Sequence, residues 1–232
     1  MNFKEMWKKY AAIRDIVIIV SAMVILRSSV VNWYVIPSGS MLPTIKLNDH
    51  VFVNKLSYGL MLPFTEKQLL SWNKPKRGDI ILFKSVTEDV TLVKRAIGLS
   101  GDRISFERGT LKINGEKVQE QEQTDRSILA DMGEPADLRT LYMESTRDLP
   151  EHTMLRTTYG GFTNMEVRDW TIPEGKIFVM GDNRDSSNDS RFWGYVDEEK
   201  VYGRSLFILY STIPDSGLLP KFRTDRFFKT MH

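Results

Sequence analysis

Cysteine is absent from the chain of 232 residues, and histidine occurs only three times, as His50, His152 and His232. The absence of thiols excludes disulfides, thiol nucleophiles and thiolate metal sites. The few histidines leave little material for a zinc site or for a Ser-His-Asp triad. If a serine is the nucleophile here, we therefore expect its base to be a residue other than histidine.

A strong charge of either sign is also absent. The chain has 32 lysines and arginines and 30 aspartates and glutamates, which gives a formal net charge of +2. Nucleic-acid binding normally requires a clear excess of basic residues, so this balance indicates no nucleic-acid partner.

Long apolar runs are absent too, with one exception near the N-terminus. Residues 16–26 read IVIIVSAMVIL, follow four basic residues and precede Arg27, and apolar character resumes within residues 30–34. No small-residue cleavage site follows the run, so we expect an uncleaved transmembrane signal anchor over residues 15–34. Residues 1–14 are then a cytoplasmic or interfacial segment, and the basic residues direct the remainder of the chain outward. A helix packed on the globular body is the alternative.

The body of the chain has the pattern of a mainly β protein. Five runs of β-branched or aromatic residues are bounded by turn residues: 50–54, 80–83, 90–97, 177–180 and 205–210. A sixth segment, TLKINGEKV, holds Asn114 and Gly115 between two short strands, which is typical of a type I′ hairpin.

Residues 119–168 break this pattern because they are polar, and rich in acids at first. We expect them to form an insertion, or cap, on a catalytic β core made of residues 35–118 and 169–232.

Lys94 is the residue best placed to act as the base of a serine. Strand alternation in TLVKRAIG puts Lys94 between Leu92 and Ala96 on one face. On a core face, burial penalises the ammonium form and lowers the pKa of a lysine from about 10.4 toward neutrality. Lys46 and Lys55 have more polar neighbours in the sequence and are expected to be solvated surface charges. An ordinary lysine at a sheet edge is the alternative for Lys94.

A polar loop, GDNRDSSNDSR at residues 181–191, follows the fourth of the five runs. Its alternating acids suggest a calcium loop, but two arginines among the ligands would weaken cation binding. We expect the opposite charges to pair with one another and to stiffen a loop that presents a hydroxyl beside the amine.

The candidate nucleophile is Ser40, in the segment IPSGSMLPTI. Pro37 and Pro43 restrict the backbone on both sides of the serine. Gly39 lets the backbone come close to a substrate carbonyl. This segment therefore favours a hydroxyl held at a fixed geometry.

Four segments in order, behind the anchor, resemble bacterial type I signal peptidases: PSGSMLPT (37–44), RGDIILF (77–83), KRAIGLSGD (94–102) and GDNRDSSNDSRFWG (181–194). The resemblance covers the anchor and the β core but not the insertion. It implies an antiparallel β fold and a Ser/Lys dyad protease that needs no cofactor or metal. It also implies that the enzyme removes signal peptides from exported preproteins at the bacterial plasma (inner) membrane. The single-pass chain would then have a cytoplasmic N-terminus and an extracytoplasmic catalytic domain in contact with lipid.

The resemblance also implies roles for individual residues. Ser40 matches the nucleophile and Lys94 the general base. Ser38 matches the side-chain donor of the oxyanion hole, which works with the backbone N–H of Ser40. Ser187 matches the hydroxyl that orients the lysine.

Further residues are implied to support the loop or to meet the substrate. Asp189 and Arg191 match an ion pair that supports the loop. Four apolar residues border the nucleophile or the base and are candidates to form shallow substrate pockets, with plain core packing as the alternative: Ile36, Met41, Leu42 and Val93. Trp193 and the tail of residues 221–229 are candidates for lipid contact, against core packing for Trp193 and a frayed tail.

Other functions remain open at this level. A Ser/Lys peptidase specialised for pilin or conjugation-system maturation would share these motifs. A self-cleaving repressor would carry a DNA-binding helix pair where this chain has an anchor. A non-catalytic, membrane-tethered β domain would bind exported chains without cutting them.

Overall fold

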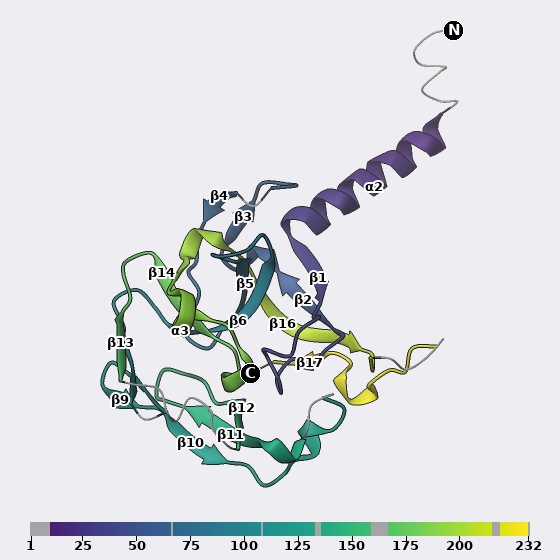
Figure 1. Cartoon of the computed structure of the whole chain (residues 1–232). Helices are drawn as coiled ribbons and strands as arrows, with labels where there is room; N and C mark the ends of the chain where they lie inside the picture. Colours follow the sequence, from purple (N-terminus) through teal and green to yellow (C-terminus); the bar gives the residue numbers. More distant parts are fainter. Residues whose placement is uncertain are drawn as a thin grey trace.

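The body of the protein is built from antiparallel strands, as expected (Figure 1). The computed structural model describes residues 10–65, 67–107, 109–132, 136–158, 167–214 and 219–231. The largest sheet has the order β1-β2-β16-β5-β6-β14-β15, with β17 paired to β16. Its strands are β1 (Val31–Val35), β2 (Asp49–Asn54), β5 (Ile80–Lys84), β6 (Thr91–Gly98), β14 (Lys176–Met180), β15 (Val196–Asp197), β16 (Val201–Ser211) and β17 (Lys229–Thr230). All five predicted runs are strands of this sheet.

Three smaller sheets, one long helix and several short ones complete the described chain. The sheets are β13-β7-β8-β9 (Arg168–Thr171, Arg103–Glu107, Thr110–Ile113, Glu116–Lys117), β10-β11-β12 (Gln119–Glu122, Arg139–Ser145, His152–Thr157) and β3-β4 (Gly59–Met61, Gln68–Ser71). The α-helices are α2 (Ala11–Ser29) and α3 (Ser190–Trp193). The 3-10 turns are η1 (Lys55–Ser57), η2 (Ser127–Leu129), η3 (Ala136–Leu138), η5 (Arg184–Ser186), η6 (Glu198–Lys200) and η7 (Thr224–Arg226).

The predicted hairpin connects β8 to β9. Asn114 has a φ of 53° and Gly115 a φ of 84°, so both lie in the left-handed region that a type I′ turn requires. The pattern of residue types was sufficient here because the turn depends on two adjacent residues only.

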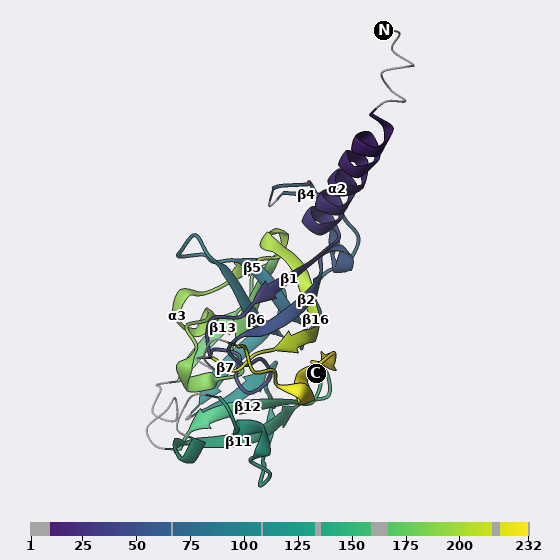
Figure 2. The same cartoon turned by 90° about the vertical axis from the view of Figure 1, so that its right-hand side faces the viewer.

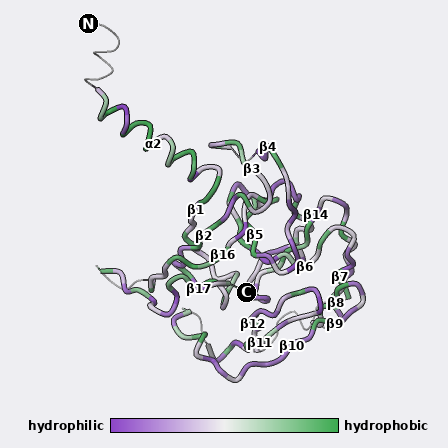
Figure 3. Tube along the Cα trace, turned by 180° about the vertical axis from the view of Figure 1, so that it is seen from behind, coloured by the Kyte–Doolittle hydropathy of each residue, from purple (hydrophilic) through white to green (hydrophobic). Residues whose placement is uncertain are grey.

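The helix α2 ends earlier than expected. We expected a span continuing to Tyr34, but α2 ends at Ser29, and Val31–Val35 form β1, which pairs with β2 along its whole length. These residues are mostly β-branched or aromatic, and pairing with β2 satisfies their backbone groups. In the part of the chain that the structure describes, no helix combines the length and the apolar character needed to cross a membrane. Figure 2 shows α2 projecting away from the body, and Figure 3 shows hydrophobic residues along it.

The core fixes the segment that carries Ser40. Met41 and Ile45 are fully buried and pack with Val51, Ile80 and Leu82 of the large sheet. Each fully buried side chain of this kind contributes about 1.5–3 kcal/mol of transfer free energy. The two residues that flank the turn after Ser40 are therefore held by the core rather than by the loop itself.

Residues 119–168, for which we keep the name insertion, contain the sheet β10-β11-β12, at the end of the body opposite α2 (Figures 1 and 2). One apolar contact with the body is a cluster of five buried residues: Leu42, Leu129, Met132, Leu141 and Leu155. Leu149 makes a second contact, in the cluster that includes Ile97 and Phe178. Leu42 belongs to the segment that carries Ser40, so the insertion packs directly on that segment.

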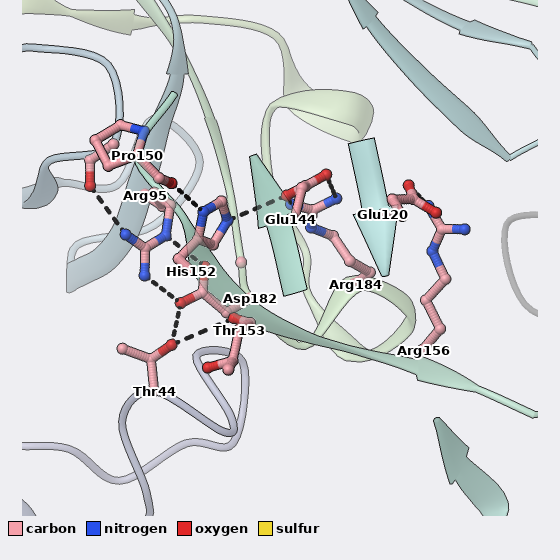
Figure 4. Close-up of polar contacts among 12 residues, drawn as sticks. Thr44, Arg95, Glu120, Glu144, Pro150, His152, Thr153, Arg156, Asp182 and Arg184 are labelled. Atoms are coloured by element: carbon pink, nitrogen blue, oxygen red, sulfur yellow. Dashed lines mark hydrogen bonds and ion pairs between the residues drawn. The ribbon is translucent and has the colours of Figure 1, made fainter. Parts of the chain in front are cut away.

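A buried carboxylate also attaches the insertion to the body. Glu144 of β11 lies between Arg184 and His152 (Figure 4). Arg184 Nη1 donates to Glu144 Oε1 at 2.9 Å, its Nη2 contacts Oε2, and His152 Nε2 lies 3.1 Å from Oε2. Burial alone raises the pKa of Glu144, but the charges of Arg184 and His152 outweigh it and hold this pKa well below its usual range. The carboxylate therefore stays ionised and binds the loop of residues 181–191 to the insertion.

Removing this charge is expected to destabilise the protein strongly. Glu144→Gln leaves the buried guanidinium of Arg184 without its counter-charge, which costs about 3–5 kcal/mol in the free energy of unfolding. Chemical denaturation of the full chain in detergent measures the loss. Glu122→Gln is the control, because Glu122 is exposed on β10 of the same sheet, and its effect should stay within about 0.5 kcal/mol. A loss below about 1 kcal/mol for Glu144→Gln would contradict this account.

Candidate active site

Ser40 lies in a compact turn between β1 and β2. The backbone N–H of Leu42 donates to Gly39 O at 3.1 Å, and that of Ile45 donates to Met41 O at 2.9 Å. These bonds close the turn immediately after the serine. The hydroxyl is thus carried by a segment that is fixed by both hydrogen bonds and core packing.

Lys94 and Ser40 are in direct contact. Lys94 Nζ lies 2.7 Å from Ser40 Oγ and donates to it, with a second bond of 3.2 Å to Val93 O. The lysine side chain is only 3% exposed. Burial lowers its pKa to about 8, although the negative charges of Asp189 and Asp182 act in the opposite direction. A free amine is therefore well populated near pH 8, within reach of the hydroxyl proton.

The expectation that Lys46 and Lys55 are solvated was wrong. Lys46 is 4% exposed, and burial together with the nearby charges of Arg226 and Arg223 lowers its pKa to about 8. Lys55 is half-buried and donates to a backbone carbonyl, and burial lowers its pKa as well. Segments distant in the sequence cover both lysines. The polar residues next to them in the sequence therefore did not indicate their burial. The low pKa alone does not distinguish Lys94; its contact with Ser40 does.

The loop of residues 181–191 contains the expected internal ion pair. Arg191 Nε donates to Asp189 Oδ1 at 2.8 Å, and both side chains are fully buried. The other oxygen of Asp189 accepts from the backbone N–H of Gly181 at 2.9 Å. Asp189 therefore joins the two ends of the loop, while Arg191 neutralises it.

Two other charges of the loop, those of Asp182 and Arg184, have their ion-pair partners outside it, contrary to expectation. Asp182 accepts from Arg95 Nε at 2.8 Å and from Arg95 Nη2 at 2.7 Å, while Arg184 binds Glu144 of the insertion (Figure 4). Thr44 Oγ1 also donates to Asp182, at 2.5 Å. The loop is therefore held from outside, by β6, by the insertion and by the segment that carries Ser40. In the described ranges, no cluster of three or more His, Asp or Glu residues could hold a metal ion.

Ser187 lies close to Ser40 but does not bind the lysine in this structure. Its Oγ is buried and makes no hydrogen bond within the described chain. A Cβ on Gly181 would lie 2.3 Å from Ser187 Oγ and 2.4 Å from the carbonyl oxygen of Ser40. Only glycine permits this close approach of the loop to the serine. The role of Ser187 toward Lys94 stays a prediction.

A groove of about 380 Å³ runs beside the dyad. Its walls come from residues 34–41 and 90–94, together with Leu82. Of the residues expected to meet the substrate, three lie along it: Ile36, Met41 and Val93. Ser38 lies there too, with an exposed side chain that makes no hydrogen bond in the described chain.

Leu42 does not line the groove, contrary to expectation. It is fully buried against the insertion, in the cluster that includes Leu129 and Leu141. The turn after Ser40 is helical in character, so adjacent residues point in different directions. Met41 therefore faces the groove and the large sheet, whereas Leu42 faces the insertion.

Several residues of this site escaped the sequence reasoning. Asp182 and Arg95 are buried and bound to each other, and half-buried Thr44 of the serine segment donates to Asp182. The alternation of side chains along β6 predicted that Arg95 lies on the face opposite Lys94. It did not predict which residue Arg95 binds. The pairing depends on a contact across 87 residues of sequence, which no local pattern encodes.

The chain is similar to known proteins over most of its length. The family model described as signal peptidase, peptidase S26, matches residues 9–210. Signal peptidase I of Pseudomonas aeruginosa is 35% identical over 216 residues, covering 86% of this chain and 72% of that one. Signal peptidase I of Pseudomonas fluorescens is 36% identical with the same coverage. A solved signal peptidase I from Enterococcus faecalis is 32% identical, covering 58% of this chain and 98% of that one, with a TM-score of 0.34. With most of its length matched by the family model, this chain belongs to the signal peptidase family, peptidase S26.

Proposed function

We propose that the chain is a membrane-anchored serine endopeptidase that removes N-terminal signal peptides from exported preproteins. The observation that carries this proposal is the 2.7 Å contact between Lys94 Nζ and Ser40 Oγ at the wall of a groove. Membership of the signal peptidase family supports the substrate class. The lowered pKa of Lys94 supports its role as base.

The proposed reaction uses the lysine twice. Neutral Lys94 takes the proton of Ser40 Oγ as this oxygen attacks the carbonyl before the cut, and the resulting ammonium protonates the leaving amine. The same amine, neutral again, then activates a water that hydrolyses the ester. The backbone N–H of Ser40 and the hydroxyl of Ser38 serve as the oxyanion hole, since neither makes a hydrogen bond within the described chain.

The residues around the dyad have supporting roles in this proposal. Ser187 orients the amine, which agrees with its buried and otherwise unbonded hydroxyl. Asp189 and Arg191 hold the loop that carries it. Ile36, Met41 and Val93 form apolar walls that suit small apolar side chains next to the cut.

We also propose that α2 is the membrane anchor, with residues 1–14 in the cytoplasm and the catalytic domain on the outer face of the bacterial plasma membrane. The apolar side chains of α2 are exposed over almost the whole stretch from Ile16 to Leu26. By itself the described α2 falls short of the length and apolar character of a full span. Its 19 residues extend about 28 Å, against about 30 Å for the hydrocarbon core of a bilayer. The guanidinium of Arg27 lies over the ring of Trp33, with 4.0 Å between the guanidinium carbon and the ring centroid. A charged side chain near the end of a membrane helix extends its head group toward the interface in this way.

Lipid contact by the body is best supported at the hairpin β3-β4. Phe64 is 73% exposed, and Leu70 and Trp72 are also exposed. The backbone N–H of Phe64 donates to Ser28 Oγ at 2.6 Å, so the hairpin lies at the end of the proposed anchor. Aromatic and apolar side chains next to the end of a membrane anchor suit the interface between the bilayer and water.

The earlier candidates for lipid contact fit less well. Trp193 packs toward Phe83, with 6.2 Å between the ring centroids, in an apolar cluster of the core. The tail is not frayed, because Arg223 and Arg226 are buried and bonded to the body. Phe228 of the tail is nevertheless 68% exposed.

Substitutions at the dyad test the proposed chemistry. Ser40→Ala and Lys94→Met should each abolish cleavage of a preprotein, and Lys94→Arg should be equally inactive because a guanidinium does not give up its proton. Lys46→Met is the matched control: Lys46 is equally buried and has a similar pKa but binds Ala130 O instead of a serine. N-terminal sequencing of the product reports both activity and cut site. Clear turnover by Ser40→Ala or Lys94→Met would refute the assignment, and an inactive wild type would favour a non-catalytic binding domain.

The pH dependence of kcat/KM tests the state of the amine. The reactive form of Lys94 is the neutral one, so kcat/KM should rise with pH, reach half its maximum near the pKa of about 8, and level off above it. Circular dichroism over the same range controls for changes in folding. A flat profile between about pH 6 and 9 would show that no such base titrates.

The absence of cysteine permits a direct test of topology. Glu88→Cys places a thiol at an exposed position between β5 and β6, and Glu5→Cys places one ahead of α2. A membrane-impermeant maleimide added to spheroplasts should label the first variant at once and the second only after lysis. Labelling of both variants, or of Glu5→Cys alone, would contradict the proposed orientation.

A further inference from the structure

Asn183 makes two contacts with the segment that carries Ser40. Its side-chain Nδ2 donates to Gly39 O at 3.0 Å, and its backbone N–H donates to Ser40 O at 3.1 Å. The residue is fully buried. It touches neither Lys94 nor the hydroxyl of Ser40 through any hydrogen bond, so the proposed chemistry leaves it without a role.

The carbonyl that Asn183 binds has a special position. Gly39 C=O and Ser40 N–H belong to one peptide group, which is planar and trans, so the two bonds point in opposite directions. Fixing the carbonyl therefore fixes the direction of the N–H. Gly39 O accepts a second bond, of 3.1 Å, from Leu42 N–H, and Ser40 N–H itself donates to no group of the described chain. The peptide is thus held from its carbonyl side, with its N–H left for a ligand.

Asn183 is in turn fixed by the insertion. Arg139 Nη1 of β11 donates to its Oδ1 at 3.4 Å, which assigns the amide so that its NH₂ end faces Gly39. The backbone N–H of Leu155 in β12 donates to Asp182 O at 2.8 Å, and Leu155 forms an isolated bridge with Asn183. The neighbouring carboxylate of Asp182 is held by Arg95 and Thr44 (Figure 4). The donor on Gly39 O therefore has little freedom to move.

We propose that Asn183 is a positioning residue that aims the backbone N–H of Ser40 at the oxyanion of the tetrahedral intermediate. The insertion, through Arg139 and Leu155, keeps Asn183 in place, which gives that sheet a part in the reaction. This inference rests on the proposed function, since it assumes that Ser40 attacks a carbonyl. Asn183 acts only through the Gly39–Ser40 peptide and does not touch the substrate.

Kinetics of two variants test this role. Asn183→Ala removes the donor, and Asn183→Asp keeps the shape and the acceptor for Arg139 but sets a carboxylate against Gly39 O. A misdirected oxyanion donor should lower kcat roughly 10- to 100-fold with KM within about twofold of wild type. The midpoint of the pH profile of kcat/KM should not move, because Lys94 is untouched. Asn188→Ala is the matched control: the same residue type in the same loop, with an exposed side chain and no hydrogen bond in the described chain.

A transition-state analogue separates positioning from a general structural effect. A peptide boronic acid, which forms a tetrahedral adduct with Ser40, should lose affinity in proportion to kcat/KM in the Asn183 variants, whereas binding of an uncleavable substrate peptide to the same variants should not change. Thermal unfolding identifies whichever variant remains folded at the assay temperature, and one folded variant is sufficient. Near wild-type kcat, a loss confined to KM, or unchanged boronic acid affinity in a folded variant would overturn the inference. If wild type itself cleaves no preprotein, the proposed function has failed and this inference fails with it; an active wild type with unaffected variants refutes the inference alone.

Discussion

The site depends on one amine that is kept away from water while it touches a hydroxyl. Lys94 is 3% exposed and its Nζ lies 2.7 Å from Ser40 Oγ. In water the same amine would be protonated at neutral pH and unable to accept a proton. The rest of the body can be understood as what is needed to exclude solvent there and to hold the two atoms together.

Three separate parts of the chain meet this requirement. Strand β6 supplies the lysine from the middle of the large sheet, where β5 and β14 cover both its edges. The segment that carries Ser40 is anchored by Met41 and Ile45 in the core. The loop of residues 181–191 closes the third side, and the insertion holds that loop through the buried ion pair of Glu144 with Arg184. The insertion is therefore a structural neighbour of the reaction although it contributes no group to the dyad.

The fold was largely predictable from the sequence because its signals are local. Runs of β-branched and aromatic residues between turn residues located five strands, and two adjacent residues determined the hairpin turn at Asn114 and Gly115. The end of α2 was not predictable in the same way. Residues 30–34 are apolar enough for either a helix or a strand, and pairing with β2 decides between them.

The site was predictable where a side chain's own strand or turn determines its environment, as for Lys94. It was not predictable where the environment comes from distant segments. Lys46 looked solvated, but it is buried, its Nζ binds Ala130 O, 84 residues later in the sequence, and the charges of Arg223 and Arg226 act on it. Leu42 looked like a pocket residue, but the insertion buries it.

Burial alone does not explain why the amine of Lys94 can lose its proton. Asp189 and Asp182 both lie close enough to raise its pKa, and either carboxylate left unpaired would favour the ammonium form. Each is instead bound by a guanidinium, Asp189 by Arg191 and Asp182 by Arg95. These pairs reduce the negative potential at the amine, so desolvation remains the largest effect. Paired charges in the interior are often of little value to stability, because desolvation offsets their attraction. Here the two ion pairs hold the loop through buried polar contacts. Because each carboxylate is paired, it favours the ammonium form of Lys94 less than an unpaired carboxylate would.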